Sequence, residues 1–303
     1  MRTQKRSQWR DVHGVVLLDK PQGLSSNQAL QKVRRLFSAA KAGHTGSLDP
    51  LATGLLPICL GEATKIAGLL LGSQKAYVTE CLLGVTTDSA DAEGEVLLTR
   101  PVPVLDSTII EQALVGLRGR ISQVPPIYSA LKRDGVPLYR LARRGEVVDV
   151  PAREVEVHAF ELLAIERDVL RLQVTCGSGT YVRSLVRDLG EALGCGAHVT
   201  ALRRLWVAPF HAPRMYTLEE LEQVANDGRA ALDALLLPLE AGLSDHAHVS
   251  LDATQALHLG QGRSLALDLA PGNYLAYDDA QRLLALAEVA EDGVLRVVRG
   301  FNL

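Results

Sequence analysis

The chain has 303 residues, of which 47% are hydrophobic, 22% charged and 4% aromatic, and its formal net charge is -3. This composition supplies a core built mostly of Leu, Val and Ala, excludes a disordered chain, and suits one large domain with a smaller one. The polar, basic N-terminus contains no signal-peptide core, and no apolar run is long enough to span a membrane.

Charge is unevenly distributed along the chain. Residues 1–214 hold 27 Lys and Arg against 21 Asp and Glu, whereas residues 215–303 hold 5 against 14. Residues 20–48 contain five basic side chains and no acidic one, and residues 132–144 contain five more against a single acid. Such clusters can contact phosphates, although either one alone is more often an ordinary solvated surface.

The four cysteines are Cys59, Cys81, Cys176 and Cys195. They form no C-x-x-C pair and show no zinc-type spacing with histidines. Three of them lie in apolar runs, which is typical of small core residues in a reducing setting. We therefore expect a cytoplasmic protein that contains no metal site.

The first half of the chain alternates short apolar segments with amphipathic ones. The expected elements are a strand over 15–18, a helix over 25–37, a glycine-rich loop over 43–54, a helix over 62–71, a strand over 75–84 and an acidic turn over 88–94. In the first helix, Ala29 and Val33 share one face. Ser25 or Ser26 can cap its N-terminus.

The second half adds helices, long strands and a change of organisation near residue 245. The expected elements are a helix over 106–117, a break at 124–126, a basic helix over 138–144 ended by Gly145, strands over 154–165, 169–175 and 199–207, and helices over 181–193 and from a capping box at 217–220. Short strands with glycine turns follow. We expect an α+β fold with a mixed, largely antiparallel sheet, divided into domains 1–245 and 246–303.

The loop 43–54 has the sequence GHTGSLDPLATG and contains one carboxylate, Asp49. Its glycines let the backbone approach a substrate closely. An aspartate in such a loop can be a nucleophile, a base or a metal ligand, and it can also simply start a turn before Pro50. From the loop alone, the turn is the favoured interpretation.

Other common site motifs do not match this chain. The glycine-rich loop lacks the terminal G-K-[ST] of a phosphate-binding P-loop. Residues 88–95 lack the ligand spacing of an EF-hand, and residues 177–179 do not form a G-x-S-x-G elbow. His246, His248 and His258 show no metal-site pattern. The sequence therefore predicts neither a bound metal nor a nucleotide cofactor.

Several spaced blocks closely resemble the TruB family, the bacterial tRNA pseudouridine-55 synthases. They are residues 14–23, 41–65, 77–88, 125–132, 179–183 and 196–204, and they occur in family order along nearly the whole catalytic body. The resemblance implies a pseudouridine-synthase-like sheet flanked by helices, with a small β-rich PUA-like C-terminal domain. It also implies that a uridine in the tRNA T loop is isomerised without a cofactor, through base flipping and an aspartate nucleophile.

The resemblance assigns three catalytic residues. Asp49 matches the aspartate that attacks the target nucleotide covalently, at either C1′ of the sugar or C6 of the base. Arg183 matches the arginine that pairs with this carboxylate, and an adjacent guanidinium lowers an aspartate pKa. Tyr77 matches a tyrosine that can stack on the flipped uracil and place its hydroxyl near the migrating atoms, with a role as proton acceptor as a further option. Taken alone, Arg183 would be a surface helix residue and Tyr77 a half-buried strand residue.

Further matches suggest residues that bind substrate. His44 matches the histidine that fills the space left in the T loop by extruded bases. Tyr181 and Leu202 match residues that line the uracil pocket, although each alone would be ordinary core. Lys20 and Pro21, in the block 14–23, are expected to support the active-site loop, and a phosphate contact by the Lys20 ammonium is a further option.

Two features depart from the family pattern. The family often carries Ser-Lys-Gly-Thr-Tyr before the arginine, but here Ser178 stands at the lysine position, so a basic residue is missing beside the pocket. The C-terminal region is acidic, which argues against a large phosphate-binding contribution. We expect tRNA, through its T stem-loop, as the partner of a protein that is monomeric by default.

Two other function classes are consistent with parts of the sequence. A non-catalytic RNA-binding or tRNA-folding module would explain the basic residues and would bind tRNA in a salt-dependent manner. A phosphatase with an aspartate nucleophile would need a D-x-D-type pair and Mg²⁺, and no such pair surrounds Asp49. The set of Asp49, Tyr77 and Arg183 favours the uridine isomerase.

Overall fold

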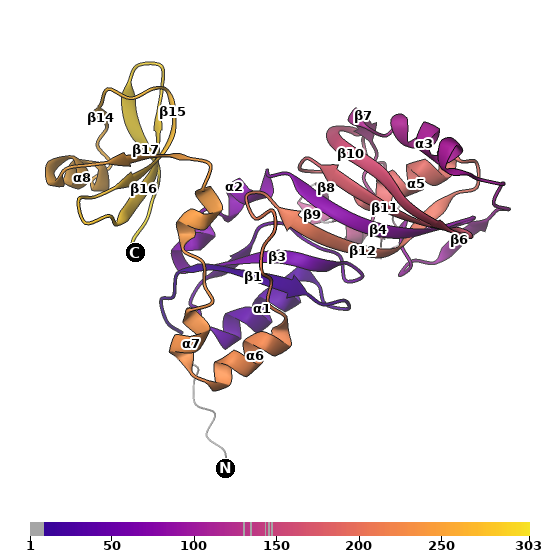
Figure 1. The fold of residues 1–303 in the computed structure, drawn as a ribbon, viewed down its shortest axis with the longest axis horizontal. Helices are drawn as coiled ribbons and strands as arrows, with labels where there is room; N and C mark the ends of the chain where they lie inside the picture. The colour runs from indigo at the N-terminus through magenta and orange to yellow at the C-terminus, as the bar shows by residue number, and fades with distance from the viewer. Residues whose placement is uncertain (1–8, 130, 134, 143, 145, 147) are drawn as a thin grey trace, which may run out of the picture.

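The computed structural model of the chain describes residues 9–303 except 130, 134, 143, 145 and 147. At its centre lies an eight-stranded sheet with the order β1-β3-β12-β4-β11-β10-β7, and β2 pairs with β3 beside this path (Figure 1). The strands are β1 Gly14–Lys20, β2 Ala42–His44, β3 Thr53–Leu60, β4 Lys75–Leu83, β7 Gly119–Gln123, β10 Arg153–Glu166, β11 Val169–Cys176 and β12 Ala197–Val207. Within the described residues, β12 and β3 pair in parallel and the other pairs are antiparallel. The predicted mixed, largely antiparallel sheet is confirmed.

Helices cover this sheet at both of its ends (Figure 1). The helices of the body are α1 Ser26–Leu36, α2 Ala67–Leu71, α3 Ser107–Val115, α5 Val182–Ala192, α6 Leu218–Asn226 and α7 Arg229–Asp233, with short 3-10 helices η1 Gly61–Lys65 and η2 Leu239–Leu243, and α4 Leu138–Ala142 lies apart from the sheet. Ser25 caps α1 and Thr217 caps α6, each in a capping box with the side chain three residues later. The predicted N-termini of both helices are therefore confirmed.

Three local predictions differ from the structure. The loop predicted over 43–54 is shorter, because its two ends belong to β2 and β3. β3 was not anticipated: its residues after Thr53 are buried on both faces, so they show no alternation. The helix predicted over 62–71 is divided into η1 and α2 by Ile66. The predicted helix end at Gly145 lies outside the described residues.

A close backbone approach joins the loop to the sheet at Gly54. Its φ is +96°, and an added Cβ would lie 2.2 Å from the carbonyl oxygen of Arg204 in β12. A side chain there would clash with backbone atoms that have no room to move. Glycine is therefore required where the parallel pair of β3 and β12 begins.

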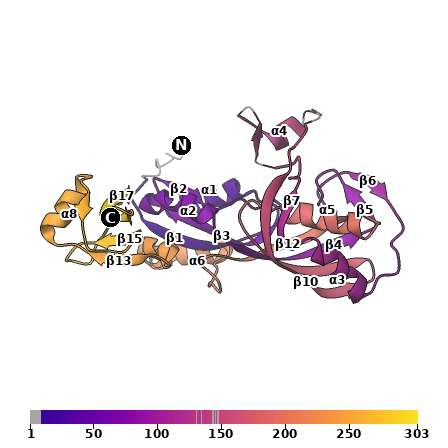
Figure 2. The same ribbon diagram turned by 90° about the horizontal axis from the view of Figure 1, so that it is seen from above.

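Small hairpins and one projecting segment complete the body. They are β5 Val85–Thr87 with β6 Val96–Thr99, and β8 Lys132–Arg133 with β9 Val136–Pro137. The segment that contains α4 projects from the sheet (Figure 2). In the part of the chain that the structure describes, no helix has the length and apolarity needed to cross a membrane.

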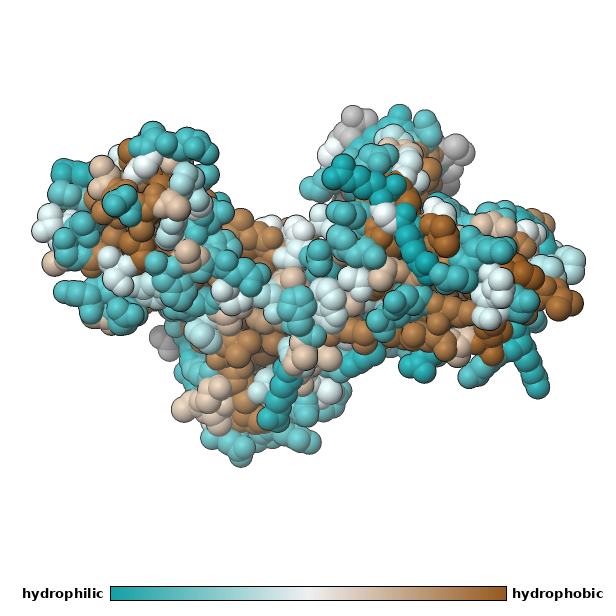
Figure 3. All heavy atoms as spheres, turned by 45° about the horizontal axis from the view of Figure 1, so that its top comes forward, coloured by the Kyte–Doolittle hydropathy of each residue, from teal (hydrophilic) through white to brown (hydrophobic). Residues whose placement is uncertain are grey.

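The C-terminal part forms a second sheet and a separate lobe (Figure 3). Its strand order is β13-β15-β16-β17-β14, with β13 Ala247–Ser250, β14 Leu265–Ala266, β15 Gly272–Tyr277, β16 Leu283–Val289, β17 Val294–Gly300 and helix α8 Ala253–Gly260. The predicted β-rich module is confirmed. Phe301 and Leu286 share a core with Ile66 and Leu239 of the body. This apolar contact attaches the C-terminal lobe to the body. The predicted domain boundary between residues 245 and 246 stays a prediction.

Candidate active site

The Asp49 loop lies between β2 and β3 and is held by the first turn of α1. The hydroxyl of Ser26 accepts a hydrogen bond from the Leu48 amide at 2.7 Å and donates one to the Leu48 carbonyl at 3.0 Å. The Ala52 amide donates to the Asp49 carbonyl at 3.1 Å, which closes a turn. The Asp49 side chain is 39% exposed, so its carboxylate remains open on one side.

Arg183 connects this carboxylate to a second one. Its Nη2 lies 2.9 Å from Oδ2 of Asp49, and its Nη1 lies 3.2 Å from Oδ2 of Asp91. The two nitrogens also donate to the carbonyls of Tyr128 and Ser89 at 2.8 and 2.9 Å. The Arg183 side chain is only 4% exposed. Arg183 lies in the first turn of α5 and its guanidinium points inward. It is therefore not the exposed helix residue that its position alone would suggest.

Asp91 was not identified from the sequence beyond its place in an acidic turn. Its side chain is 4% exposed, and its Oδ1 accepts hydrogen bonds from the Ser89 hydroxyl at 2.6 Å and the Glu93 amide at 3.1 Å. These contacts fix one carboxylate behind the guanidinium, while Asp49 stays accessible in front of it. The sequence contains no local signal for this pairing, because the two acids meet only through Arg183.

Desolvation has the largest effect on the Asp49 carboxyl, even though 39% of the side chain is exposed. It raises the pKa of Asp49 above the ordinary value for aspartate, although Arg183 opposes the shift and Asp91 reinforces it. The sequence suggested that the arginine would lower this pKa. The guanidinium does act in that direction, but desolvation of the carboxyl outweighs it.

Tyr77 and Arg204 face each other on neighbouring strands. They are cross-strand partners in β4 and β12, and the Arg204 guanidinium acts on the Tyr77 phenol in the direction that lowers its pKa. Burial raises the pKa of Tyr77 above its ordinary value. The Arg204 side chain donates to the carbonyls of Leu55 at 2.7 Å and Gly46 at 3.3 Å. Arg204 thus lies beside Tyr77 and is hydrogen-bonded to the backbone on both sides of Asp49. The sequence did not predict this role, although Arg204 ends one of the family blocks.

Lys20 and Lys75 add two buried ammonium groups. Lys20 is fully buried, and its Nζ donates to the carbonyls of Pro21 at 2.8 Å and Leu24 at 2.6 Å. Lys75 donates to the carbonyls of Ser73 and Leu71 at 2.6 and 3.1 Å. Burial lowers the pKa of each lysine to about 8. Because its ammonium is buried and already bonded to the 21–24 segment, Lys20 is better placed to support this segment than to contact a substrate directly.

The other predicted site residues are His44, Leu202 and Tyr181. His44 is half-buried in β2, its Nδ1 accepts from the Gly46 amide at 3.4 Å, and burial together with Arg204 lowers its pKa. Leu202 lies in β12 with 8% exposure. Tyr181 caps α5, two residues before Arg183.

Known proteins match nearly the whole chain. Residues 34–182 match the TruB family pseudouridylate synthase (N terminal domain), and residues 183–244 match the tRNA pseudouridylate synthase B C-terminal domain. The tRNA pseudouridine synthase B of Xanthomonas campestris pv. campestris (strain B100) is 57% identical over 298 residues, which cover 98% of this chain and 96% of that protein. The chain belongs to the TruB family. It is therefore an RNA pseudouridine synthase, an isomerase, as its resemblance implied.

Other relatives of this TruB-family chain agree in sequence and in fold. The tRNA pseudouridine synthase B of Xylella fastidiosa (strain Temecula1 / ATCC 700964) is 57% identical over 300 residues, covering 98% of this chain and 99% of that protein. A chain in the crystal structure of a Cbf5-Nop10-Gar1 complex superposes with a TM-score of 0.70 at 26% identity, covering 91% of this chain and 78% of that chain. The pseudouridine-synthase-like fold is confirmed.

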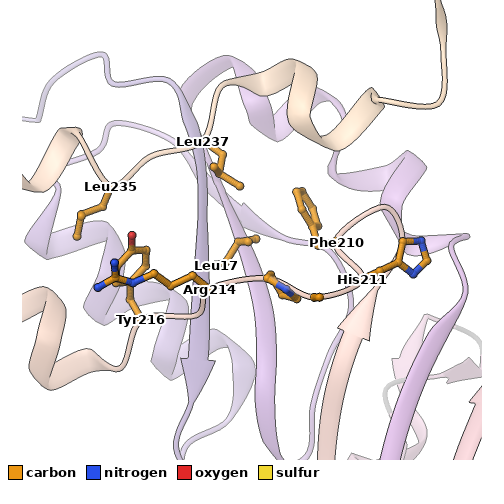
Figure 4. Close-up of a pocket in the computed structure, with 9 residues that line it drawn as sticks. Leu17, Phe210, His211, Arg214, Tyr216, Leu235 and Leu237 are labelled. Atoms are coloured by element: carbon orange, nitrogen blue, oxygen red, sulfur yellow. The ribbon is translucent and has the colours of Figure 1, made fainter.

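A pocket of about 310 Å³ lies away from Asp49, beside β1. Its lining includes Leu17, Phe210, Leu235 and Leu237, and the Arg214 guanidinium is stacked on the Tyr216 ring (Figure 4). Its lining includes none of the predicted site residues of this TruB-family protein. Among the described residues, no group of three or more His, Cys, Asp or Glu side chains is arranged to hold a metal ion.

The buried lysines of this TruB-family protein predict a pH effect on stability. The folded-state pKa of Lys75 is about 8, against 10.5 for the ordinary side chain, so between these values the unfolded chain binds more protons. The wild-type free energy of unfolding therefore gains a contribution from Lys75 as pH rises from about 8 to 10.5. We expect Lys75→Met to lose that contribution.

Urea denaturation at several pH values measures this difference between Lys75→Met and wild type. The stability of the variant relative to wild type should fall as pH rises through the window. Using the difference cancels the opposing contribution of Cys59 and Cys81, whose raised pKa values do not depend on Lys75. Cys176 interacts with Lys75, so the comparison is made in a Cys176→Ser background for both proteins. A difference that is independent of pH would contradict the depressed pKa of Lys75.

Proposed function

We propose that this protein isomerises a uridine in the T loop of tRNA, with Asp49 as the nucleophile. The observation that carries the proposal is the arrangement of one half-open carboxylate, Asp49, against a buried guanidinium, Arg183, which a second carboxylate holds from behind. Relatives with more than half of their residues identical are named tRNA pseudouridine synthase B, which supports tRNA as the substrate.

The proposed reaction begins with covalent attack by ionised Asp49 on the target nucleotide. The bond between N1 of uracil and C1′ of ribose breaks, the base rotates, and a bond between C5 and C1′ forms. The bond between Asp49 and the nucleotide then breaks, which releases the product and regenerates the Asp49 carboxylate. C5 loses a proton and N1 gains one, so product and substrate are isomers and atoms balance without another reactant. Arg183 favours the ionised form of Asp49 against the opposing effect of burial.

Other side chains of the site have proposed roles around the flipped base. Tyr77 can stack on the uracil from its buried position opposite Arg204 in the neighbouring strand. Tyr181 and Leu202 would line the same pocket. His44 would fill the space that the extruded base leaves in the RNA stack.

The RNA partner fits the distribution of charge. The T stem-loop would contact the basic residues of the body, and the projecting segment around α4 adds Arg140 and Lys132 to that surface (Figure 2). The acidic C-terminal lobe, which resembles a PUA-like domain, packs on the body through apolar residues and would contribute little phosphate binding. We further propose a cytoplasmic monomer, whose four buried free cysteines suit a reducing compartment.

Mass mapping of one T-loop minihelix tests the proposal, after a pseudouridine-selective chemical label has been added, because the isomerisation itself leaves the mass unchanged. After incubation with the wild-type protein and no added cofactor, pseudouridine should occur at a single T-loop position, and a minihelix with cytidine there should remain unmodified. The competing candidate is an RNA-binding module without catalysis, which the basic residues favour. Salt-dependent binding of the minihelix with no pseudouridine would support that candidate and overturn the isomerase assignment.

A further inference from the structure

Arg153, the first residue of β10, lies against the turn that leads into α5. Its Nη2 donates to the carbonyl of Gly179, and its Cζ lies 5.0 Å from the centre of the Tyr181 ring. A Cβ added at Gly179 would be only 3.6 Å from that Cζ, so the guanidinium packs closely on the turn. Arg153 therefore brings a positive charge to the residues that precede Arg183.

Gln123 holds the other partner of this stack in place. Its fully buried side chain accepts a hydrogen bond from the Tyr181 amide at 2.8 Å and donates one to the Tyr181 carbonyl at 3.2 Å. Gln123 ends β7 and is the cross-strand partner of Arg153. One pair of strands thus fixes both the backbone of Tyr181 and the cation that covers its ring.

The Arg153 guanidinium has no acidic partner in the part of the chain that the structure describes. Among the described residues it forms no ion pair within 4.0 Å, whereas Arg183 contacts two carboxylates. Gly179 accepts from Nη2, and Nε is buried without an acceptor. A guanidinium has five N–H donors in a planar fork, which suits a phosphate better than a single carbonyl.

We propose that Arg153 binds a backbone phosphate of the RNA substrate beside the nucleotide that enters the Asp49 site. This inference rests on the proposed function, because it assumes that Tyr181 borders the pocket for that nucleotide. Ser178, at the exposed tip of the same turn, provides no charge. Arg153 reaches the turn from another strand and supplies the cation that this segment lacks.

The salt dependence of RNA binding tests the contact. Loss of one phosphate contact should reduce the slope of log Kd against log salt by about 0.7 to 0.9. For Arg153→Gln we expect this change together with a roughly tenfold weaker Kd for a T-stem-loop RNA. Arg167→Gln removes the same charge from an exposed turn at the far end of β10, and its Kd and slope should match wild type.

A rescue experiment separates charge from packing. Ser178→Lys placed in the Arg153→Gln background restores a cation on the turn without the stack on Tyr181, and it should recover most of the Kd and of the slope. Arg153→Lys, which keeps the charge at its own position, should lie between wild type and Arg153→Gln. This conservative variant also keeps the test open if Arg153→Gln folds poorly, which a thermal melt of the free protein would reveal.

Two results would overturn the inference. One is an unchanged Kd and salt slope in both Arg153 variants. The other is a lower kcat at an unchanged Kd and slope, which would mean that Arg153 only holds Tyr181 in place. Both require a wild-type protein that forms pseudouridine in the same RNA, because a wild type that forms none would instead refute the proposed function.

Discussion

Asp49→Asn is expected to abolish pseudouridine formation, with a loss on the order of 10⁴-fold or more, because an amide cannot act as the nucleophile. The fold should survive the change. Asparagine has nearly the same shape, the site is half-open, and Arg183 keeps Asp91 as its counter-ion. Mass mapping of the minihelix after pseudouridine-selective labelling measures the loss, and a thermal melt measures the stability.

Two further observations make the Asp49 experiment decisive. The variant should still bind the minihelix, which separates catalysis from RNA binding. Asp279→Asn, a change of the same kind at an exposed position in the C-terminal lobe, should retain wild-type activity. Full activity in Asp49→Asn would refute the nucleophile assignment.

Arg183→Met should reduce both activity and stability. Removing the guanidinium leaves Asp91, whose side chain is 4% exposed, as a buried and unpaired charge. Breaking a buried ion pair in this way costs about 3–5 kcal/mol of unfolding free energy. Activity should fall on the order of 10³-fold, since the pKa of Asp49 loses the partner that opposes its rise. Any residual activity should appear only at a higher pH, because the pKa of Asp49 would be higher without Arg183.

A double variant and a surface control test this explanation. Arg183→Met combined with Asp91→Asn should regain part of the lost stability, since the buried charge is removed with its partner. Arg100→Met breaks an ion pair with Glu191 whose side chains are 29% and 49% exposed, and it should change stability by no more than about 1 kcal/mol. Denaturant midpoints measure the stability of Arg183→Met, of the double variant and of Arg100→Met. A double variant that is no more stable than Arg183→Met would contradict the buried-charge argument.

Much of the fold followed from local patterns. Helix caps at Ser25 and Thr217 and the long strands now seen as β10 and β11 were predicted because caps and alternation are properties of neighbouring residues. β3 escaped prediction because a strand buried on both faces has no alternation. Its place between β1 and β12 depends on residues far away in the chain.

The candidate site was predicted unevenly. The glycine-rich loop and the family blocks pointed to Asp49, Tyr77 and Arg183. Nothing in the sequence singled out Asp91 or Arg204, because a charged residue in an acidic turn or a strand is usually solvated. Their importance comes from burial and from partners on other strands.

By itself, the sequence determined the α+β character, the glycine-rich turn around Asp49 and, through the resemblance, the family. The tertiary structure alone decided which charges meet. It set Asp49 and Asp91 on the same guanidinium, and it brought the uncompensated Arg153 beside Tyr181. The physical reason is that desolvation and ion pairing depend on distances between side chains of separate strands and helices, which local sequence patterns do not encode.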